Sequence, residues 1–175
     1  VALACKKLKL TCNIIMPVTA PENKINAVKR LGAKITLHGE NLADALVEAD
    51  KVSKKYKYTF VHPFDDQFTI AGQGTVGKEI LEDGIDYDSI FVPVGGGGLL
   101  AGISAWVRQK NKKIKIVGVE VDDSACLTEA LKSNKRVLLE RVGLFADGVA
   151  VSQVGKNNLD AVSYTHLTLP TKLSV

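Results

Sequence analysis

Four consecutive glycines, Gly95 to Gly98, lie between two segments whose apolar patterns predict different secondary structures. Residues 90–94 are apolar on both faces and predict a buried parallel strand. From Leu99 to Lys110 the apolar residues recur at helical spacing, which predicts a helix. Glycines between a strand and a helix leave backbone N–H groups uncovered at the positive end of the helix. The run therefore predicts an anion site, most often one for a phosphate group.

The glycine run differs from both common nucleotide-binding motifs. It lacks the spaced glycines of a dinucleotide site and the Gly-Lys-Ser/Thr ending of a P-loop. Residues 72–78 match the beginning of a P-loop, but Glu79 stands where that motif needs a hydroxyl group. Their helical spacing indicates close helix packing instead. A tight turn is the simpler interpretation of residues 95–98, but the entropy cost of four glycines favours close approach to a ligand.

Apolar runs and helical patterns alternate along the chain, which predicts an α/β protein with parallel strands. Asn41 is expected to cap one helix, and residues 19–22 resemble a capping box that opens another. The predicted strands are residues 12–18, 33–37, 58–61, 90–94 and 114–121. The predicted helices cover residues 22–31, a segment after Asn41, and residues 66–83, 99–110 and 124–132. Residues 142–152 have no clear period but are apolar, and we expect them to be a packed loop.

The short repeating units give way to a long helix after residues 62–66, where we expect the chain to cross between two lobes. The first lobe is predicted to cover residues 1–62 and the second residues 63–162. Residues 163–175 abandon the preceding pattern and resemble an in-frame translation of a transposon-derived sequencing adapter. We expect this tail to be non-native. The alternative is an edge strand, because apolar and polar residues alternate within it.

Composition excludes several classes of function. The net charge of +4 comes from scattered lysines, and aromatic residues are only 6% of the chain, which argues against nucleic-acid binding. No apolar run reaches the roughly 20 residues that a membrane helix needs. Cys5, Cys12 and Cys126 have no metal-ligand spacing, and a reducing cytoplasm suits their odd number. The chain begins at Val1 with helical spacing already under way, so we expect it to be part of a longer protein.

Other polar residues give weaker signals. His38 and His62 have no second histidine at ligand spacing, and each is interpreted as a structural or surface residue. Glu120 and the acidic residues after it end a strand, where such groups are usually solvated. The sequence contains no convincing Ser-His-Asp or Cys-His arrangement.

Several motifs together resemble the fold-type II pyridoxal-phosphate enzymes. Residues 92–99 are similar to the phosphate cup of that family. Residues 16–17, 20–21 and 24, followed by Gly32-Ala33, resemble the small domain of its threonine and serine dehydratases. Residues 72–75 are similar to the helix that leads back into the large domain. Residues 123–127 and 141–151 resemble the biosynthetic threonine dehydratases in particular.

The resemblance implies a three-layer α/β/α fold, similar to that of the tryptophan synthase β subunit, with parallel-rich sheets in two lobes and here incomplete. It implies pyridoxal 5'-phosphate (PLP) as cofactor, with its phosphate held by Gly95, Gly96, Gly97, Gly98 and Leu99. The implied reaction is deamination of L-threonine, with L-serine as the alternative substrate. For threonine the products are 2-oxobutanoate, on the route to isoleucine, and ammonia. The implied full-length protein is a homo-oligomer.

The resemblance also implies what this chain lacks. The family's aldimine lysine stands in a Ser-x-Lys-x-Arg-Gly-like motif, expected upstream of Val1, so no lysine here is assigned a catalytic role and the fragment is expected to be inactive. Metal-binding relatives carry an acid six residues after the equivalent of Glu120, where this chain has Cys126, so no metal site is expected. The alternatives are a serine dehydratase, another β-eliminating enzyme, and a non-catalytic domain that binds a phosphate ligand.

Overall fold

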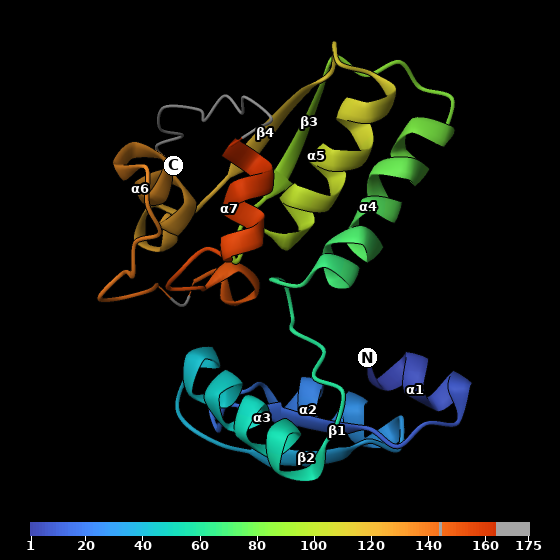
Figure 1. Ribbon diagram of the computed structural model, residues 1–175, viewed down its shortest axis with the longest axis vertical. Helices are drawn as coiled ribbons and strands as arrows, with labels where there is room; N and C mark the ends of the chain where they lie inside the picture. The colour runs from blue at the N-terminus through green and yellow to red at the C-terminus, as the bar shows by residue number, and fades with distance from the viewer. Residues whose placement is uncertain (144, 164–175) are drawn as a thin grey trace. The chain divides into compact units, whose positions relative to one another are not determined.

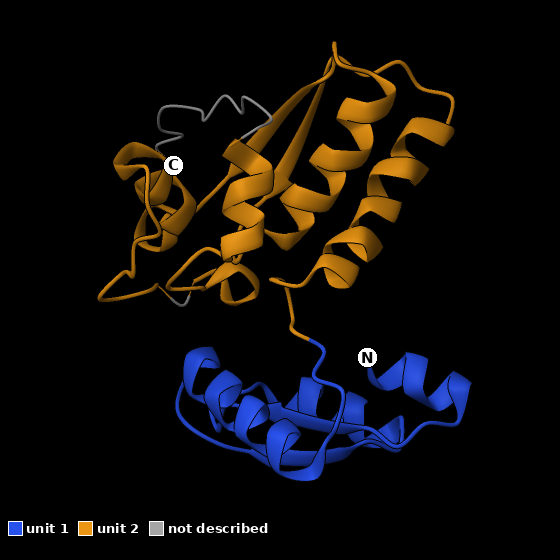
Figure 2. Ribbon diagram, viewed as in Figure 1, with its two compact units in different colours: residues 1–61 blue, residues 62–175 orange. Residues whose placement is uncertain are grey.

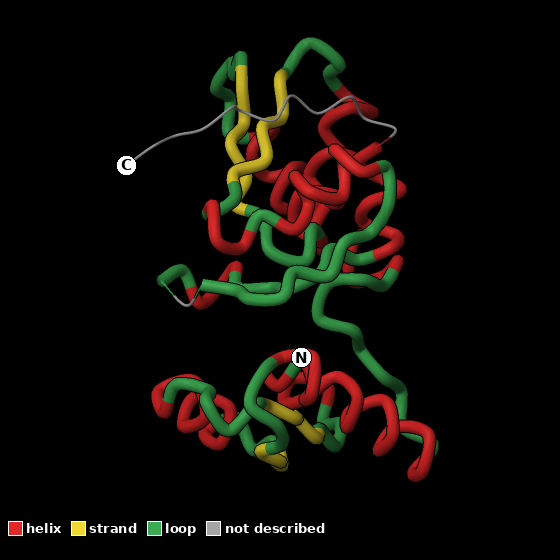
Figure 3. Tube along the Cα trace, turned by 90° about the vertical axis from the view of Figure 1, so that its left-hand side faces the viewer, coloured by secondary structure: helices red, strands yellow, loops and turns green. Residues whose placement is uncertain are grey.

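The computed structural model describes residues 1–143 and 145–163, and these fall into two compact units (Figure 2). The first unit is Val1–Val61 and the second begins at His62. The secondary-structure elements of each unit are labelled in Figure 1, and Figure 3 shows the same elements after a quarter turn. None of the described helices is long and apolar enough to cross a membrane.

The first unit has a parallel two-stranded sheet with three helices. Strands β1 (Asn13–Met16) and β2 (Lys34–Leu37) pair in parallel, with Asn13 opposite Lys34. Helix α1 (Ala2–Leu8) precedes the sheet, α2 (Glu22–Arg30) connects the two strands and packs on β2, and α3 (Leu42–Tyr56) packs on β1. Within these residues, only Ala2 and Ala45 are buried hydrophobic side chains, so this unit has a very small core.

The strands and helices predicted over residues 12–37 and after Asn41 are present in the first unit, but two other expectations for this unit are wrong. Asn41 caps α3 as predicted, since its side-chain Oδ1 accepts a hydrogen bond from the Asp44 backbone N–H at 3.0 Å. Thr19 caps no helix, because its hydroxyl donates to the carbonyl oxygen of Glu40 and α2 begins later, after Pro21. Residues 58–61 are not a strand, because no described strand pairs with them.

The second unit carries the glycine run on its own parallel pair of strands. Strands β3 (Ser89–Pro93) and β4 (Lys115–Val119) pair with Ser89 opposite Lys115. Helix α5 (Gly98–Lys110) connects them and packs on β3, while α4 (Gln67–Glu82) packs along α5. Helices α6 (Cys126–Ser133) and α7 (Lys156–Ser163) follow, with short 3-10 turns at Asp122–Ser124 and Asp147–Val149.

The core of the second unit lies where α5 meets the strands, α6 and α7. Its largest fully buried apolar side chains are Leu100, Ile116, Leu127, Val92, Val94, Val107, Val154 and Val162. The expectation that β3 is buried on both faces is wrong, because Ile90 and Val92 are buried whereas Phe91 is 64% exposed. In the described residues the helices cover the strand on the side that Ile90 and Val92 occupy.

Residues 72–78, which match only the beginning of a P-loop motif, are part of the interface between α4 and α5. A Cβ atom added at Gly74 would lie 3.2 Å from the carbonyl oxygen of Gly102, and one at Gly77 would lie 3.3 Å from that of Ile103. These glycines therefore let the two helix backbones approach closely, as their spacing predicted. The last described element, α7, ends at Ser163, and residues 164–175 of the suspected tail lie outside the described residues.

Candidate functional site

The predicted site residues Gly95 to Gly98 and Leu99 form the connection between the end of β3 and the first turn of α5. Gly97 is the N-cap of α5, and its φ of 90° is in the left-handed region that side-chain-bearing residues rarely adopt. Gly96, Gly97 and Gly98 are buried, whereas Gly95 and Leu99 are half-buried. The local pattern of an apolar strand, glycines and an amphipathic helix thus places all five predicted residues in one turn.

The backbone N–H groups of residues 95–99 have no hydrogen-bond acceptor within the described part of the chain. The first N–H groups of any helix lack a partner inside the helix, and here no side chain of the turn supplies one. Buried backbone donors are almost always satisfied in proteins, because leaving one without a partner costs free energy. The turn therefore offers several donors to an external acceptor at the positive end of α5.

The carbonyl groups of the same turn are held from the opposite direction. The Gly96 oxygen accepts hydrogen bonds from the Asn158 Nδ2 group at 2.7 Å and from the Gly155 backbone N–H at 3.0 Å. The Cys126 thiol donates to the Gly95 oxygen at 3.5 Å. In a planar trans peptide the C=O and the following N–H point in opposite directions, and the chain has no cis peptide bonds. The hydrogen bonds to the Gly95 and Gly96 carbonyls therefore direct the N–H groups of Gly96 and Gly97 to the opposite side, away from the groups that donate to those carbonyls.

The glycines are also required by the packing of the chain itself. A Cβ atom at Gly96 would lie 2.3 Å from the Phe64 ring, and one at Gly98 would lie 2.7 Å from the Phe64 carbonyl oxygen. At Gly95 it would lie 3.0 Å from the Cα atom of Val149. The α-carbon side of the turn is therefore filled by protein. The four glycines were interpreted as allowing close approach of a ligand, but in part they allow close approach of neighbouring segments of this chain.

The segment before α4 supports the turn through residues that sequence patterns did not single out. The Asp65 carboxylate accepts hydrogen bonds from the backbone N–H groups of Lys156 and Asn157, both at 2.9 Å, and so caps α7. Asp66 caps α4 by accepting from Phe68 and Thr69. A pair of acids before a helical pattern predicts the second cap, but nothing local indicates the first.

His62 stabilises the same segment as a neutral side chain. Its Nδ1 atom accepts hydrogen bonds from the backbone N–H of Asp65 at 2.8 Å and from that of Phe64 at 3.3 Å. An Nδ1 that accepts cannot carry a proton. Burial lowers the pKa of His62 below its usual value, although the Asp65 and Asp66 carboxylates act in the opposite direction. This geometry gives the histidine the structural role expected from the sequence.

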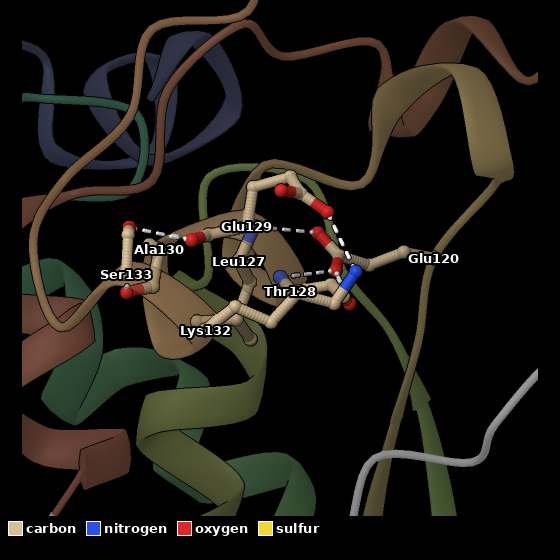
Figure 4. A network of polar contacts seen from close by, with 7 residues as sticks. All are labelled: Glu120, Leu127, Thr128, Glu129, Ala130, Lys132 and Ser133. Carbon is tan, nitrogen blue, oxygen red and sulfur yellow. Dashed lines mark hydrogen bonds and ion pairs between the residues drawn. The ribbon is translucent and has the colours of Figure 1, made fainter.

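Glu120 caps α6 and is not the solvated acid that its place at a strand end suggested. Its carboxylate accepts hydrogen bonds from the backbone N–H groups of Leu127 and Thr128, both at 2.8 Å, and from the Thr128 hydroxyl at 2.7 Å (Figure 4). Burial, with the nearby Glu120 carboxylate, raises the pKa of the Cys126 thiol to about 12. Cys126 therefore faces the glycine turn as a protonated donor.

The acidic groups that follow β4 lie at an open pocket whose lining includes none of residues 95–99. The pocket is lined by residues that include Asp122, Asp123, Glu129, Glu140 and Arg141. Among the described residues, no group of three or more His, Cys, Asp or Glu side chains is placed to hold a metal ion. The apolar loop before α7 is only partly packed, since Phe145 is 95% exposed.

A family model described as "pyridoxal-phosphate dependent enzyme" matches residues 1–168. The chain belongs to this family. It is 48% identical over 155 residues to the biosynthetic L-threonine dehydratase of Pasteurella multocida, a match that covers 89% of this chain and 30% of that protein. It is 46% identical over 166 residues to the mitochondrial threonine dehydratase of Schizosaccharomyces pombe, covering 93% and 28%. The chain thus spans less than a third of these curated relatives.

Solved structures of the pyridoxal-phosphate family have the same fold. The processed form of threonine deaminase isoform 2 from Solanum lycopersicum matches with a TM-score of 0.87 and 38% identity, over 97% of this chain and 50% of that one. Maize serine racemase matches with a TM-score of 0.89 and 27% identity, over 96% and 51%. The predicted fold class, α/β with parallel sheets as in the fold-type II enzymes, and the predicted family are both confirmed.

Proposed function

We propose that this chain is part of a PLP-dependent threonine ammonia-lyase that converts L-threonine to 2-oxobutanoate and ammonia. The choice of threonine as the substrate is supported by the 43–48% identity of this chain to dehydratases named for threonine in both bacteria and plants. Among solved structures, threonine deaminase isoform 2 from Solanum lycopersicum matches at 38%, whereas a second threonine deaminase and a serine racemase both match at 28%. The proposal therefore places threonine before serine.

The cofactor phosphate is proposed to bind the backbone N–H groups of Gly95, Gly96, Gly97, Gly98 and Leu99. These groups have no other acceptor in the described residues, and they lie at the positive end of α5. The turn carries no acidic side chain. Of the carboxylates around it, Asp65 is committed to the first N–H groups of α7 and Glu120 to those of α6. The residues present therefore fit a dianionic phosphate.

The contribution of this chain to the reaction is binding and orientation. When bound, the pyridine ring of PLP supplies the electron sink that lets the substrate lose its α-proton and its β-hydroxyl group. Residues 95–99 would hold the phosphate end of the cofactor, and the rigid strand and helix on either side would fix its direction. We assign the covalent tether and the base for the α-proton to no lysine of this chain, and we propose that the isolated chain is inactive.

The remaining parts of the proposal concern the whole protein. Residues 1–62 are proposed to belong to the small lobe and residues 63–162 to the large, PLP-binding lobe. The full-length protein is proposed to be a homo-oligomer that acts on a free amino acid in the cytoplasm. Relatives named mitochondrial and chloroplastic indicate that the compartment differs between organisms.

The test uses the full-length gene product that contains these residues. We expect it to release 2-oxobutanoate from L-threonine faster than pyruvate from L-serine, and Gly97→Asp to abolish PLP absorbance and turnover. Gly72→Ala is the matched control, because a Cβ atom there meets nothing within 4 Å. Faster turnover of serine would make the protein a serine dehydratase. Phosphate binding without turnover of either amino acid would make it a non-catalytic binding domain.

A further inference from the structure

Asn158 is a fully buried polar residue in the first turn of α7, at 0% exposure. Its side-chain Nδ2 group donates one hydrogen bond to the Gly96 carbonyl oxygen at 2.7 Å and another to the Phe64 carbonyl oxygen at 2.9 Å. Both N–H bonds of the amide are therefore used. These contacts join three segments that are far apart in the sequence: the glycine turn, the segment before α4, and α7.

The other end of the Asn158 amide makes no such contact. Its Oδ1 atom is buried and has no hydrogen-bond partner among the described residues. An orphaned buried acceptor costs free energy, and a leucine of similar shape would avoid that cost. The reversed orientation of the amide would place Oδ1 against two carbonyl oxygens. What the asparagine contributes is therefore its pair of donors, directed at Gly96 and Phe64.

The hydrogen bond from Asn158 to the Gly96 carbonyl orients the Gly97 N–H, which is one of the proposed donors to the cofactor phosphate. The Gly96 carbonyl and the Gly97 N–H belong to one planar peptide unit and point in opposite directions. Asn158 and the Gly155 N–H hold the carbonyl from the α7 side, so the Gly97 N–H points away from α7. Gly97, with its φ of 90°, has few steric restraints of its own, so hydrogen bonds from other residues are needed to fix the orientation of this peptide.

We propose that Asn158 is a positioning residue for the phosphate group, because it fixes the Gly96–Gly97 peptide with the Gly97 N–H directed at the anion. This inference rests on the proposed function of residues 95–99. The asparagine touches neither phosphate nor substrate in this arrangement. It acts through the backbone of the turn, and its contact with Phe64 keeps the packing that closes the α-carbon side of Gly96 and Gly98.

The test compares Asn158→Leu with the unaltered 175-residue chain by amide NMR, with inorganic phosphate and then PLP as probes. In the free protein we expect a changed chemical shift and faster hydrogen exchange at the Gly97 N–H. We expect the Kd for phosphate to rise by about ten-fold, as for loss of a hydrogen bond to a charged group. Asp160→Leu is the matched control, because Asp160 is exposed on the same helix.

The outcomes separate this inference from the cofactor proposal. If phosphate perturbs the glycine amides equally in the Asn158→Leu variant and the unaltered chain, the inference is wrong and the phosphate site stands. If neither probe perturbs those amides in the unaltered chain, the proposed site is wrong and this inference is lost with it. A purely structural role would lower the free energy of unfolding while leaving the Gly97 shift and the Kd unchanged.

A second variant and a direct measurement cover the case in which Asn158→Leu does not fold. Asn158→Ser retains one hydroxyl donor and is expected to bind phosphate with an affinity between those of the unaltered chain and a variant without a donor. In the unaltered chain, a scalar coupling across the hydrogen bond should join Asn158 Nδ2 to the Gly96 carbonyl carbon. Absence of that coupling would overturn the inference without any substitution.

Discussion

The Asp65 carboxylate accepts a hydrogen bond from the backbone N–H of Asn157 at 2.9 Å, across 92 residues of sequence. A second bond from the Lys156 N–H makes Asp65 the cap of a helix in which it does not lie. A carboxylate at this end of a helix also interacts favourably with the helix dipole. The position of Asn158 in that helix, and hence its contact with the glycine turn, depends on this cap.

We expect Asp65→Ala to lower the free energy of unfolding by about 1–2 kcal/mol, the range for loss of a helix cap. Urea unfolding followed by circular dichroism measures the change. Asp160→Ala is the control, because that aspartate is exposed on the same helix. Equal effects of the two substitutions would show that the cap contributes nothing beyond a surface charge.

Gly97→Ala and Gly72→Ala should change stability in opposite directions. At Gly97 the φ of 90° and the Asn158 Cβ atom 3.1 Å away oppose a side chain, and we expect a loss of about 1–2 kcal/mol. Gly72 lies in α4 with open space at its Cβ position, so alanine there should stabilise by about 0.4–1 kcal/mol. Thermal unfolding of both variants checks the pair, and a stabilising Gly97→Ala would contradict the turn geometry.

Cys126 should resist thiol reagents while the protein is folded. At pH 8 we expect an aromatic disulfide reagent to label the half-buried Cys5 and Cys12 first, and Cys126 only in denaturant. Burial raises the pKa of Cys126 from 9.0 to about 12, so the folded state keeps a proton that the unfolded state loses. Its contribution to stability is therefore full below pH 9 and declines as the pH rises toward 12.

The variant Cys126→Ala should remove that alkaline decline. Mass spectrometry of peptides identifies the labelled cysteines, and unfolding curves measured at increasing pH follow the decline. Rapid labelling of Cys126 in the folded chain would show that the thiol is not buried against the Gly95 carbonyl.

His62 should make the second unit sensitive to mild acid. Burial lowers its folded-state pKa below the usual 6.5, so the unfolded state binds the proton more readily. The stability that neutral His62 contributes is present above pH 6.5 and is lost as the pH falls through the lower folded value. The variant His62→Asn supplies an acceptor oxygen that does not titrate and should flatten the free energy of unfolding between pH 7 and pH 5. His38→Asn serves as the control, and an equal flattening there would contradict the assignment.

The parts of the fold that the sequence predicted are those set by neighbours along the chain. The strand, glycine run and helix of residues 89–110 follow from local apolar spacing, and the Asn41 cap follows from one residue and the helix after it. The exposure of Phe91 was missed, because alternation cannot tell which face of an apolar strand has a neighbour. Residues 58–61 have strand-like composition, but a strand forms only beside a partner.

The contacts that hold the candidate site could not be predicted from the sequence, because they too depend on residues far apart in the chain. Asn158 and Asp65 act on backbone groups 62 and 91 residues away, and no periodic pattern records such pairs. At Thr19 a local motif predicted a contact that does not form. Residues 19–22 have the composition of a capping box, but the Thr19 hydroxyl donates to the Glu40 carbonyl oxygen and not to a helix. Binding of the cofactor by residues 95–99 stays a prediction, now with specific donors to test.

The hold on the Gly96 carbonyl has a consequence for the order in which this protein matures on the ribosome. The glycine turn emerges from the exit tunnel well before its donors, because Gly155 and Asn158 follow Gly96 by about 60 residues. A nascent chain that ends before Gly155 has the strand, the glycines and α5, but it lacks both donors to the Gly96 carbonyl. The orientation of the Gly96–Gly97 peptide is therefore fixed only after α7 has been synthesised, and so well after the turn itself has been translated.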